Sequence, residues 1–150
     1  MSIETPKKRR THQCLEKIFN TDNKHYEIGI DEAGRGPMFG RVYTGAVVLP
    51  KDSEDFHYEW MKDSKKFSSP KKIKEVAEYI KENAVAWSVT YEDEKSIDKI
   101  NILQATFKSM HHAVHNILAD GHEISCLVVD GNNFKPYAKF DNIAMKYKSV

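Results

Sequence analysis

Two apolar segments that each end in acidic residues before a glycine constrain this chain most strongly. The first covers residues 26–30 and leads into Asp31 and Glu32. The second is the continuous apolar run at residues 124–129, which ends at Asp130. Both segments have the pattern of β-strands, and ligands of α/β sheets bind beyond the carboxyl ends of strands. The pattern predicts three carboxylates around one point, although a simple turn after the second strand is an open alternative.

Strand and helix patterns alternate along the rest of the chain. Residues 41–49 predict a second strand, which a short turn would hold antiparallel to the first. A helix is predicted to begin at Pro70 with Ser69 as its N-cap. The other predicted elements are a helix at 11–20, a strand at 84–91, a helix at 102–118 and a strand-like segment at 142–150, whereas 50–69 shows no clear period. Strands separated by helices predict the α/β class, with a mixed sheet flanked by helices.

The positive charge of this chain is clustered even though its formal net charge is only +1. Residues 7–10 are four consecutive cations, and six lysines lie between residues 62 and 74. Such patches can follow a phosphate backbone, or they can simply be solvated surface. The segment PKKRR at residues 6–10 is a nuclear-import signal, a nucleic-acid-binding arm or a flexible tail. We expect residues 1–22 to be a basic extension and residues 23–150 to form one domain.

The two cysteines and the hydropathy pattern predict a location inside the cell. Cys14 and Cys126 have no metal-ligand spacing, which is typical of a protein kept in a reducing compartment. No apolar run is long enough for a membrane span, so no membrane partner is expected. The predicted location is the cytoplasm, with the nucleus as an alternative because of residues 6–10.

The acids and the turn that follows them suggest phosphate chemistry. Carboxylates are the ligands that Mg²⁺ prefers, and two such ions can promote phosphodiester hydrolysis. The turn Gly34-Arg35-Gly36 would let backbone amides approach a ligand closely. We therefore expect a metal-assisted reaction on a polyanion.

Five segments together carry a family resemblance. They are GIDEAGRGPMFG at 29–40, GAVVLP at 45–50, DSKKFS at 63–68, INILQATFKSM at 100–110 and LVVDGN at 127–132. In this order and at these spacings, they resemble type 2 ribonuclease H, also called ribonuclease HII, over roughly residues 26–150. The resemblance implies a ribonuclease H-like fold, of which this chain would contain the N-terminal portion.

The family's activity supplies the functional expectations. The resemblance implies an endonuclease that cuts the RNA strand of RNA–DNA hybrids and cuts at ribonucleotides embedded in duplex DNA. It would use two Mg²⁺ or Mn²⁺ ions and leave 5′-phosphate and 3′-hydroxyl ends. The implied catalytic and metal-binding residues are Asp31, Glu32 and Asp130. The implied substrate-binding residues are Gly34, Arg35, Gly36, Ser64, Lys65, Lys66, Asn101 and Thr106.

The resemblance also leaves two alternatives open. The family's fourth carboxylate belongs to a KGD-like motif expected after residues 146–150, and the sequence ends before it. A hybrid-binding module without catalytic activity is therefore one alternative to the enzyme. A small-molecule phosphate enzyme is the other, but the chain lacks the glycine–lysine signature of a P-loop. Protein partners remain unknown from the sequence.

Overall fold

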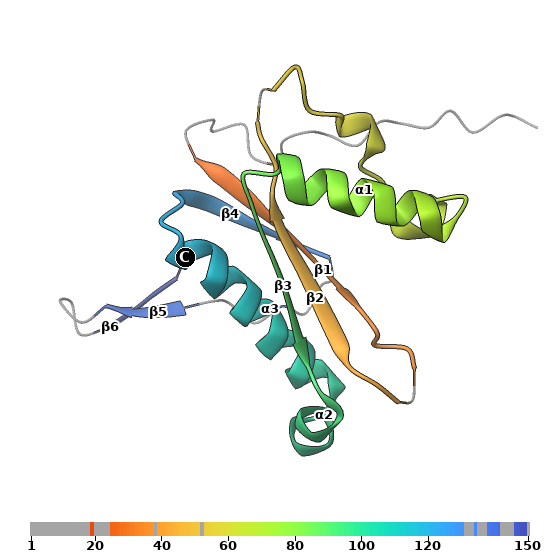
Figure 1. The fold of residues 1–150 in the computed structure, drawn as a ribbon. Coiled ribbons are helices and arrows are strands. Elements are labelled where there is room, and N and C mark those ends of the chain that lie inside the picture. The colour runs from red at the N-terminus through yellow and green to blue at the C-terminus, as the bar shows by residue number, and fades with distance from the viewer. Residues whose placement is uncertain are drawn as a thin grey trace, which may run out of the picture.

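A four-stranded mixed sheet forms the centre of the molecule. The computed structural model describes residues 25–37, 39–51 and 53–130, together with Phe19, Phe134 and the backbone of 138–141 and 146–149. The strands are β1 (Tyr26–Ala33), β2 (Val42–Val48), β3 (Ala86–Glu92) and β4 (Ile124–Val129), in the order β3-β2-β1-β4. Figure 1 shows α3 (Ile102–Ala119) running along this sheet, with α2 (Glu94–Ile100) at its N-terminal end.

The strand pairing confirms the predicted hairpin and brings distant parts of the chain together. β1 and β2 are antiparallel, with Asp31 opposite Gly45, and β2 and β3 are also antiparallel. β4 lies parallel to β1, with Val129 beside Ile30. The two apolar segments that end in acids are therefore neighbours in the sheet and run in the same direction.

The core lies between one face of the sheet and α3. Alternate residues of β1 and β2, such as Ile28 and Val48, are buried on this inner face. They pack in one cluster with the apolar side of α3, which includes Met110, Val114 and Ile117. This packing confirms the helix predicted at 102–118, because residues spaced three or four apart share a helix face. These side chains fill the inner face of the sheet. The strand residues that alternate with them point to the opposite side, which we call the outer face.

Helix α1 (Pro70–Asn83) belongs to the outer side of the sheet. It begins as predicted, because the Ser69 hydroxyl accepts a hydrogen bond from the Lys72 amide at 3.3 Å. Trp87 on β3 alternates with the buried Ala86 and Ser88, so its side chain is on the outer face. Its indole nitrogen donates to the carbonyl of Lys81 at 3.2 Å. This contact places the C-terminal end of α1 beside the outer face.

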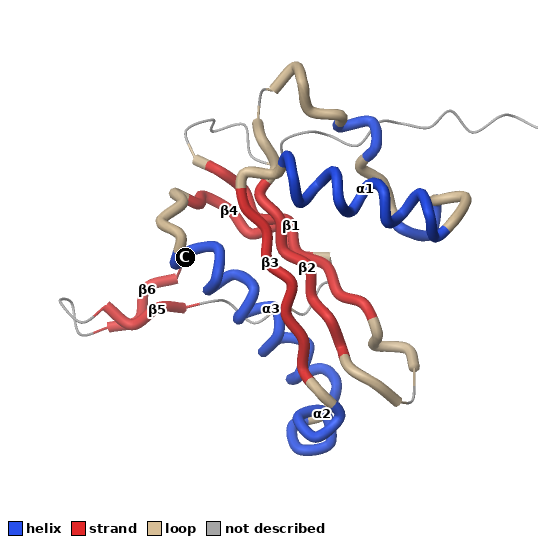
Figure 2. Tube along the Cα trace, in the orientation of Figure 1, coloured by secondary structure: helices blue, strands red, loops and turns tan. Residues whose placement is uncertain are grey.

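Several short elements were absent from the sequence prediction. Residues 50–69 contain two single-turn 3₁₀ helices, η1 (Tyr58–Trp60) and η2 (Ser64–Lys66), and α2 follows β3. The strand-like pattern at 142–150 corresponds to β6 (Lys146–Ser149), which pairs with the unpredicted strand β5 (Ala138–Asp141). Figure 2 shows this pair outside the main sheet. The helix predicted at 11–20 and the domain boundary after residue 22 lie outside the described residues, apart from Phe19. Across the described helices, none is both long and apolar enough to span a membrane.

Candidate active site

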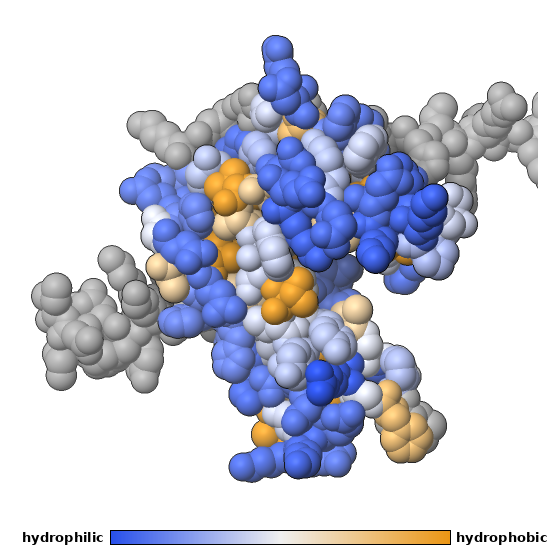
Figure 3. Space-filling model, in the orientation of Figure 1, coloured by the Kyte–Doolittle hydropathy of each residue, from blue (hydrophilic) through white to orange (hydrophobic). Residues whose placement is uncertain are grey.

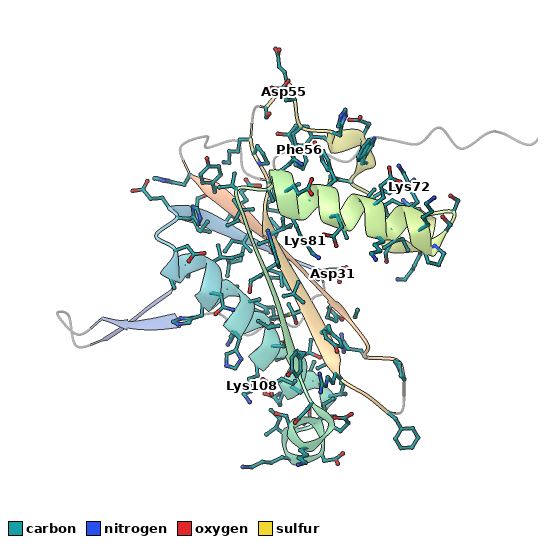
Figure 4. All side chains as sticks on the ribbon, in the orientation of Figure 1. Asp31, Asp55, Phe56, Lys72, Lys81 and Lys108 are labelled. Atoms are coloured by element: carbon teal, nitrogen blue, oxygen red, sulfur yellow. The ribbon has the colours of Figure 1, made fainter. Side chains whose placement is uncertain are left out.

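The carboxyl ends of β1 and β4 bring Asp31 and Asp130 together. The Asp130 amide donates to the Ile30 carbonyl at 3.0 Å, which continues the parallel pairing one step beyond Val129. Neighbouring residues in paired strands project from the same face. Ile30 is buried on the inner face, so Asp31 projects outward beside Asp130, and both residues are exposed. Figure 4 shows the position of Asp31 on β1.

The surroundings of Asp31 favour its protonated form. Partial burial is the main cause that raises the pKa of Asp31, and the negative charges of Asp130 and Glu32 raise it further. A hydrogen bond from the Glu32 amide, at 2.7 Å to Oδ1, and the positive charge of Lys65 act in the opposite direction. Because repulsion between acids contributes to the shift, a cation placed between Asp31 and Asp130 would relieve it.

Glu32 has a different environment from its neighbour. Its Oε1 accepts a hydrogen bond from the Arg35 guanidinium at 2.9 Å, and its side chain is only 15% exposed. In the part of the chain that the structure describes, no group of three or more His, Cys, Asp or Glu residues is arranged to hold a metal ion. The structure therefore assembles Asp31 with Asp130, whereas Glu32, predicted as a third ligand, is paired with Arg35.

The structure explains why glycine is needed at one position of the turn, Gly34, but does not require glycine at the other, Gly36. Gly34 has a φ of +94°, and a Cβ at this position would lie 2.5 Å from the carbonyl oxygen of Arg41. The fold itself therefore requires glycine there. At Gly36 the backbone has an ordinary φ, and no atom of the described chain lies within 4 Å of an added Cβ. Space beside Gly36 is open to a ligand.

The DSKK segment forms a turn with its lysines exposed beside the acids. Asp63 precedes η2 and accepts a hydrogen bond from the Lys65 amide at 2.9 Å through Oδ1. Its carbonyl accepts from the Lys66 amide, also at 2.9 Å. Ser64, Lys65 and Lys66 are all exposed, and the charge of Lys65 acts on Asp31. An aspartate two residues before a lysine amide is a recognisable cap, so the role of Asp63 at the start of η2 could be seen in the sequence.

Asn101 and Thr106 have structural roles in this molecule. Asn101 joins α2 to α3 at a φ of 67°, and its Oδ1 accepts from the Gln104 amide at 3.0 Å. It is exposed. Thr106 is 1% exposed, and its hydroxyl donates to the Ile102 carbonyl at 2.8 Å. The contact between Thr106 and a nucleic-acid duplex, which the resemblance implies, stays a prediction; in this structure the hydroxyl is buried and bonded within its own helix.

Comparison with known proteins identifies the family. A model of the family described as Ribonuclease HII matches residues 28–148. The chain belongs to the ribonuclease HII family. It is 45% identical to a ribonuclease HII of Bacteroides fragilis over 111 residues, which cover 74% of this chain and 52% of the relative. It is 44% identical to a ribonuclease HII of Chlorobaculum parvum over 116 residues, covering 77% and 55%. The chain thus spans about half the length of these curated relatives.

Solved structures agree with the ribonuclease HII assignment. A crystal structure of a variant of Bst-RNase HIII superposes with a TM-score of 0.63 at 19% identity, covering 74% of this chain and 38% of that chain, and supports the fold alone. The ribonuclease HII of Archaeoglobus fulgidus, in a complex with PCNA, superposes with a TM-score of 0.55 at 26% identity, covering 74% and 53%. The predicted ribonuclease H-like α/β fold is confirmed.

Proposed function

We propose that this protein is an endonuclease that hydrolyses the RNA strand of RNA–DNA hybrids and cuts at ribonucleotides embedded in duplex DNA. The observation that carries the proposal is the pair Asp31–Asp130 at the adjacent ends of parallel strands, in a member of the ribonuclease HII family. Cleavage would leave a 5′-phosphate and a 3′-hydroxyl end.

The chemistry of the paired acids fits divalent cations. Mg²⁺ is bound in proteins by one or two carboxylates and keeps several waters, and Mn²⁺ also suits carboxylate ligands. Asp31 and Asp130 are the residues that would hold such an ion, and a bound cation would offset the repulsion from Asp130 and Glu32 that, after burial, contributes to the raised pKa of Asp31. Two divalent cations held at this site would supply an activated water and stabilise the charge on the leaving oxygen.

The remaining site residues would bind and orient the substrate. Arg35 neutralises Glu32 in this structure, and a substrate phosphate could replace Glu32 as its partner. That exchange would release Glu32 to act as a third ligand. The backbone at Gly36 is open enough to approach a 2′-hydroxyl, the group that distinguishes RNA from DNA. Ser64, Lys65, Lys66 and Asn101 are exposed, and we propose them as contacts to the phosphate backbone.

One observation favours the alternative of a hybrid-binding module. Glu32 is paired with Arg35, and the described residues contain no group of three acids arranged to hold a metal ion, whereas the exposed Lys65 and Lys66 could still bind a polyanion.

A cleavage assay separates the two functions. The full-length protein should cut an RNA–DNA hybrid and a duplex with one embedded ribonucleotide when Mg²⁺ is present, and should leave an all-DNA duplex intact. Asp130→Asn should bind these substrates in EDTA as the parent does, but should cut them at a rate lower by at least about 100-fold. Tight binding by the parent without any Mg²⁺- or Mn²⁺-dependent cleavage would establish the binding module instead.

A further inference from the structure

The outer face of β2 and β3 carries an exposed aromatic surface. Tyr43, Val89 and Tyr91 are outward residues of these strands and are 42%, 58% and 49% exposed. Figure 3 shows one strongly apolar patch over this part of the sheet, within surface of intermediate hydropathy and next to the polar surface of α1. The sequence patterns at 41–49 and 84–91 predicted strands but no exposed aromatic surface. Exposed aromatic residues gathered on one face are typical of a binding surface.

A guanidinium group lies on this aromatic surface. The Arg41 Cζ is 4.4 Å from the centre of the Tyr91 ring, and the rings of Tyr43 and Tyr91 are 5.6 Å apart. A side-chain hydrogen bond with Tyr43 raises the pKa of Arg41, as do the nearby Tyr91 and Glu94. Arg41 is therefore an exposed positive charge that lies over the Tyr91 ring and is hydrogen-bonded to Tyr43. We call Arg41, Tyr43 and Tyr91 the aromatic shelf.

The shelf is continuous with the acids at the end of β1. Asp31 pairs with Gly45, and Gly45 pairs with Val89, so these three residues form one row across the outer face. The next outward row contains Ala33, Tyr43 and Tyr91. Strands are about 4.8 Å apart and successive outward residues of one strand are about 6.6 Å apart, so Tyr43 and Tyr91 lie roughly 8 Å and 12 Å from Asp31 along the sheet.

Glycine leaves the path between the acids and the shelf open. No atom of the described chain lies within 4 Å of a Cβ added to Gly45. A ligand bound at Asp31 can therefore extend over β2 without meeting a side chain in that row. The other end of the outer face is occupied by Trp87 and α1. The open direction leads from the acids to the shelf.

We propose that the aromatic shelf binds the sugar–phosphate backbone of the substrate duplex on one side of the cleaved position. The inference rests on the proposed function, because that function places the duplex over Asp31. A planar guanidinium matches a phosphate, and aromatic rings offer an apolar surface to the sugars beside it. Charge complementarity favours this ligand, because Arg41 adds a positive charge over the Tyr91 ring to the positive charge of Lys65, which acts on Asp31.

The test is to shorten each arm of the duplex separately. Three DNA duplexes carry one ribonucleotide: one with about 10 base pairs on each side, roughly a helical turn, and two that keep only about 3 base pairs on the 5′ or the 3′ side. Binding to the full-length protein is measured in EDTA, so that metal chemistry does not contribute. The variant is Arg41→Gln combined with Tyr91→Ser. Tyr91→Phe is the conservative control, and Lys99→Gln on α2 is a control for loss of one exposed charge.

The shelf predicts an asymmetric result. The double variant should bind the long duplex and one shortened duplex about tenfold more weakly, and should bind the other shortened duplex like the parent. The salt slope should fall by about 0.9 for the one lost phosphate contact. Tyr91→Phe and Lys99→Gln should behave like the parent. With Mg²⁺, the double variant should show a raised KM and an unchanged kcat.

Two outcomes would overturn the proposal. One is unchanged affinity of the double variant for all three duplexes. The other is equal weakening on both shortened duplexes together with a lower melting temperature, which would show that the shelf packs against protein. Failure of the proposed function looks different, because the parent would then cut no duplex and would not prefer the ribonucleotide. The arm-length dependence of the double variant could still be measured in that case.

Discussion

At the scale of single residues, two glycines of one turn give opposite expectations. Gly34→Ala should destabilise the fold by about 1–3 kcal/mol, because alanine would be strained at φ +94° and would collide with the Arg41 carbonyl. Gly36→Ala should leave the melting temperature within about 2 °C of the parent, since space is open there. If Gly36 lies against a 2′-hydroxyl, its alanine variant should lose cleavage at the ribonucleotide. Thermal unfolding and single-turnover cleavage measure the two effects, and normal cleavage by Gly36→Ala would contradict the assigned contact.

A second residue-scale prediction concerns Asp31 and pH. The pKa of Asp31 is raised in the folded state, so its ionised form opposes folding at neutral pH; this cost begins to fall as pH drops below the folded pKa and is gone below the unfolded pKa. Asp31→Asn should therefore raise the melting temperature in EDTA at pH 7. The difference from the parent should shrink as the pH falls toward the unfolded-state value of 3.8.

Addition of Mg²⁺ should reverse the order of stability of the parent and the Asp31→Asn variant. The parent should gain stability from the bound ion, whereas Asp31→Asn should gain little. The comparison needs only melting curves at several pH values, with and without Mg²⁺. A variant less stable than the parent in EDTA at pH 7 would show that Asp31 is held by favourable contacts in the folded protein.

At the scale of secondary-structure elements, a buried acid joins the end of β3 to two helices. The Glu92 side chain is 8% exposed and accepts hydrogen bonds from the Ser96 hydroxyl of α2 and from Lys108 Nζ of α3, the latter at 2.9 Å. His112 Nδ1 lies 3.7 Å from its second oxygen. Burial alone would raise the pKa of Glu92, but the bonds from Ser96 and Lys108 and the charges of Lys108 and His112 outweigh it, so the pKa is lowered.

Breaking this junction by mutation should cost stability, and the size of the loss should depend on pH. Lys108→Met should cost about 1–3 kcal/mol at pH 7, because it leaves a buried carboxylate with fewer donors. A lowered pKa gives stability that is present above the unfolded value of 4.5 and is lost as pH falls through the folded value. The difference between variant and parent should therefore shrink in acid. Urea unfolding from pH 7 to pH 3, with Lys99→Met as control, measures it. If the difference in unfolding free energy between Lys108→Met and the parent stayed constant over this pH range, ionisation of Glu92 would not be its cause.

The same elements show what the sequence could and could not predict. The end of β4 was predictable, because its apolar run stops at Asp130 before a glycine, whereas β1 continues two residues beyond the predicted end at Asp31, through Glu32 to Ala33. The predicted boundaries of α3 were also close to the observed ones, since its apolar residues keep a helical period over eighteen residues. Helix α2 was missed because seven residues are too few to show a period. Its Asp93 cap, which accepts from the Ser96 amide at 2.9 Å, was the available signal.

The site was predictable in its residues but not in its pairings. Asp31 and Asp130 meet because of the parallel register of strands about 100 residues apart, which the shared pattern suggested. The bond between Arg35 and Glu32 has no sequence signature, because either side chain could point to solvent. The outward positions of Tyr43 and Tyr91 follow from strand alternation, but their pairing with Arg41 depends on the register of β2 and β3.

At the scale of the whole molecule, function depends on local charge and not on net charge. A formal charge of +1 gives almost no long-range attraction to nucleic acid. Binding must then come from clusters that meet the duplex at defined places. Lys65 is beside the acids, and Arg41 is on the shelf. The four cations at residues 7–10 are a further cluster in the sequence, outside the described residues.

The N-terminal cluster gives the prediction that belongs to the whole chain. Replacing Lys7, Lys8, Arg9 and Arg10 by glutamine should weaken binding of an RNA–DNA hybrid at low salt, and the affinities should converge at high salt. Each lost phosphate contact lowers the slope of log K against log salt by about 0.9, so the slope should fall by at most about 4. Lys95→Gln with Lys99→Gln on α2 is the control for lost charge. The cleavage rate at saturating hybrid should not change, because the cluster would add affinity without touching the reacting phosphate. Equal slopes for the variant and the parent would show that residues 7–10 bind no nucleic acid and would leave nuclear import or a flexible tail as their role.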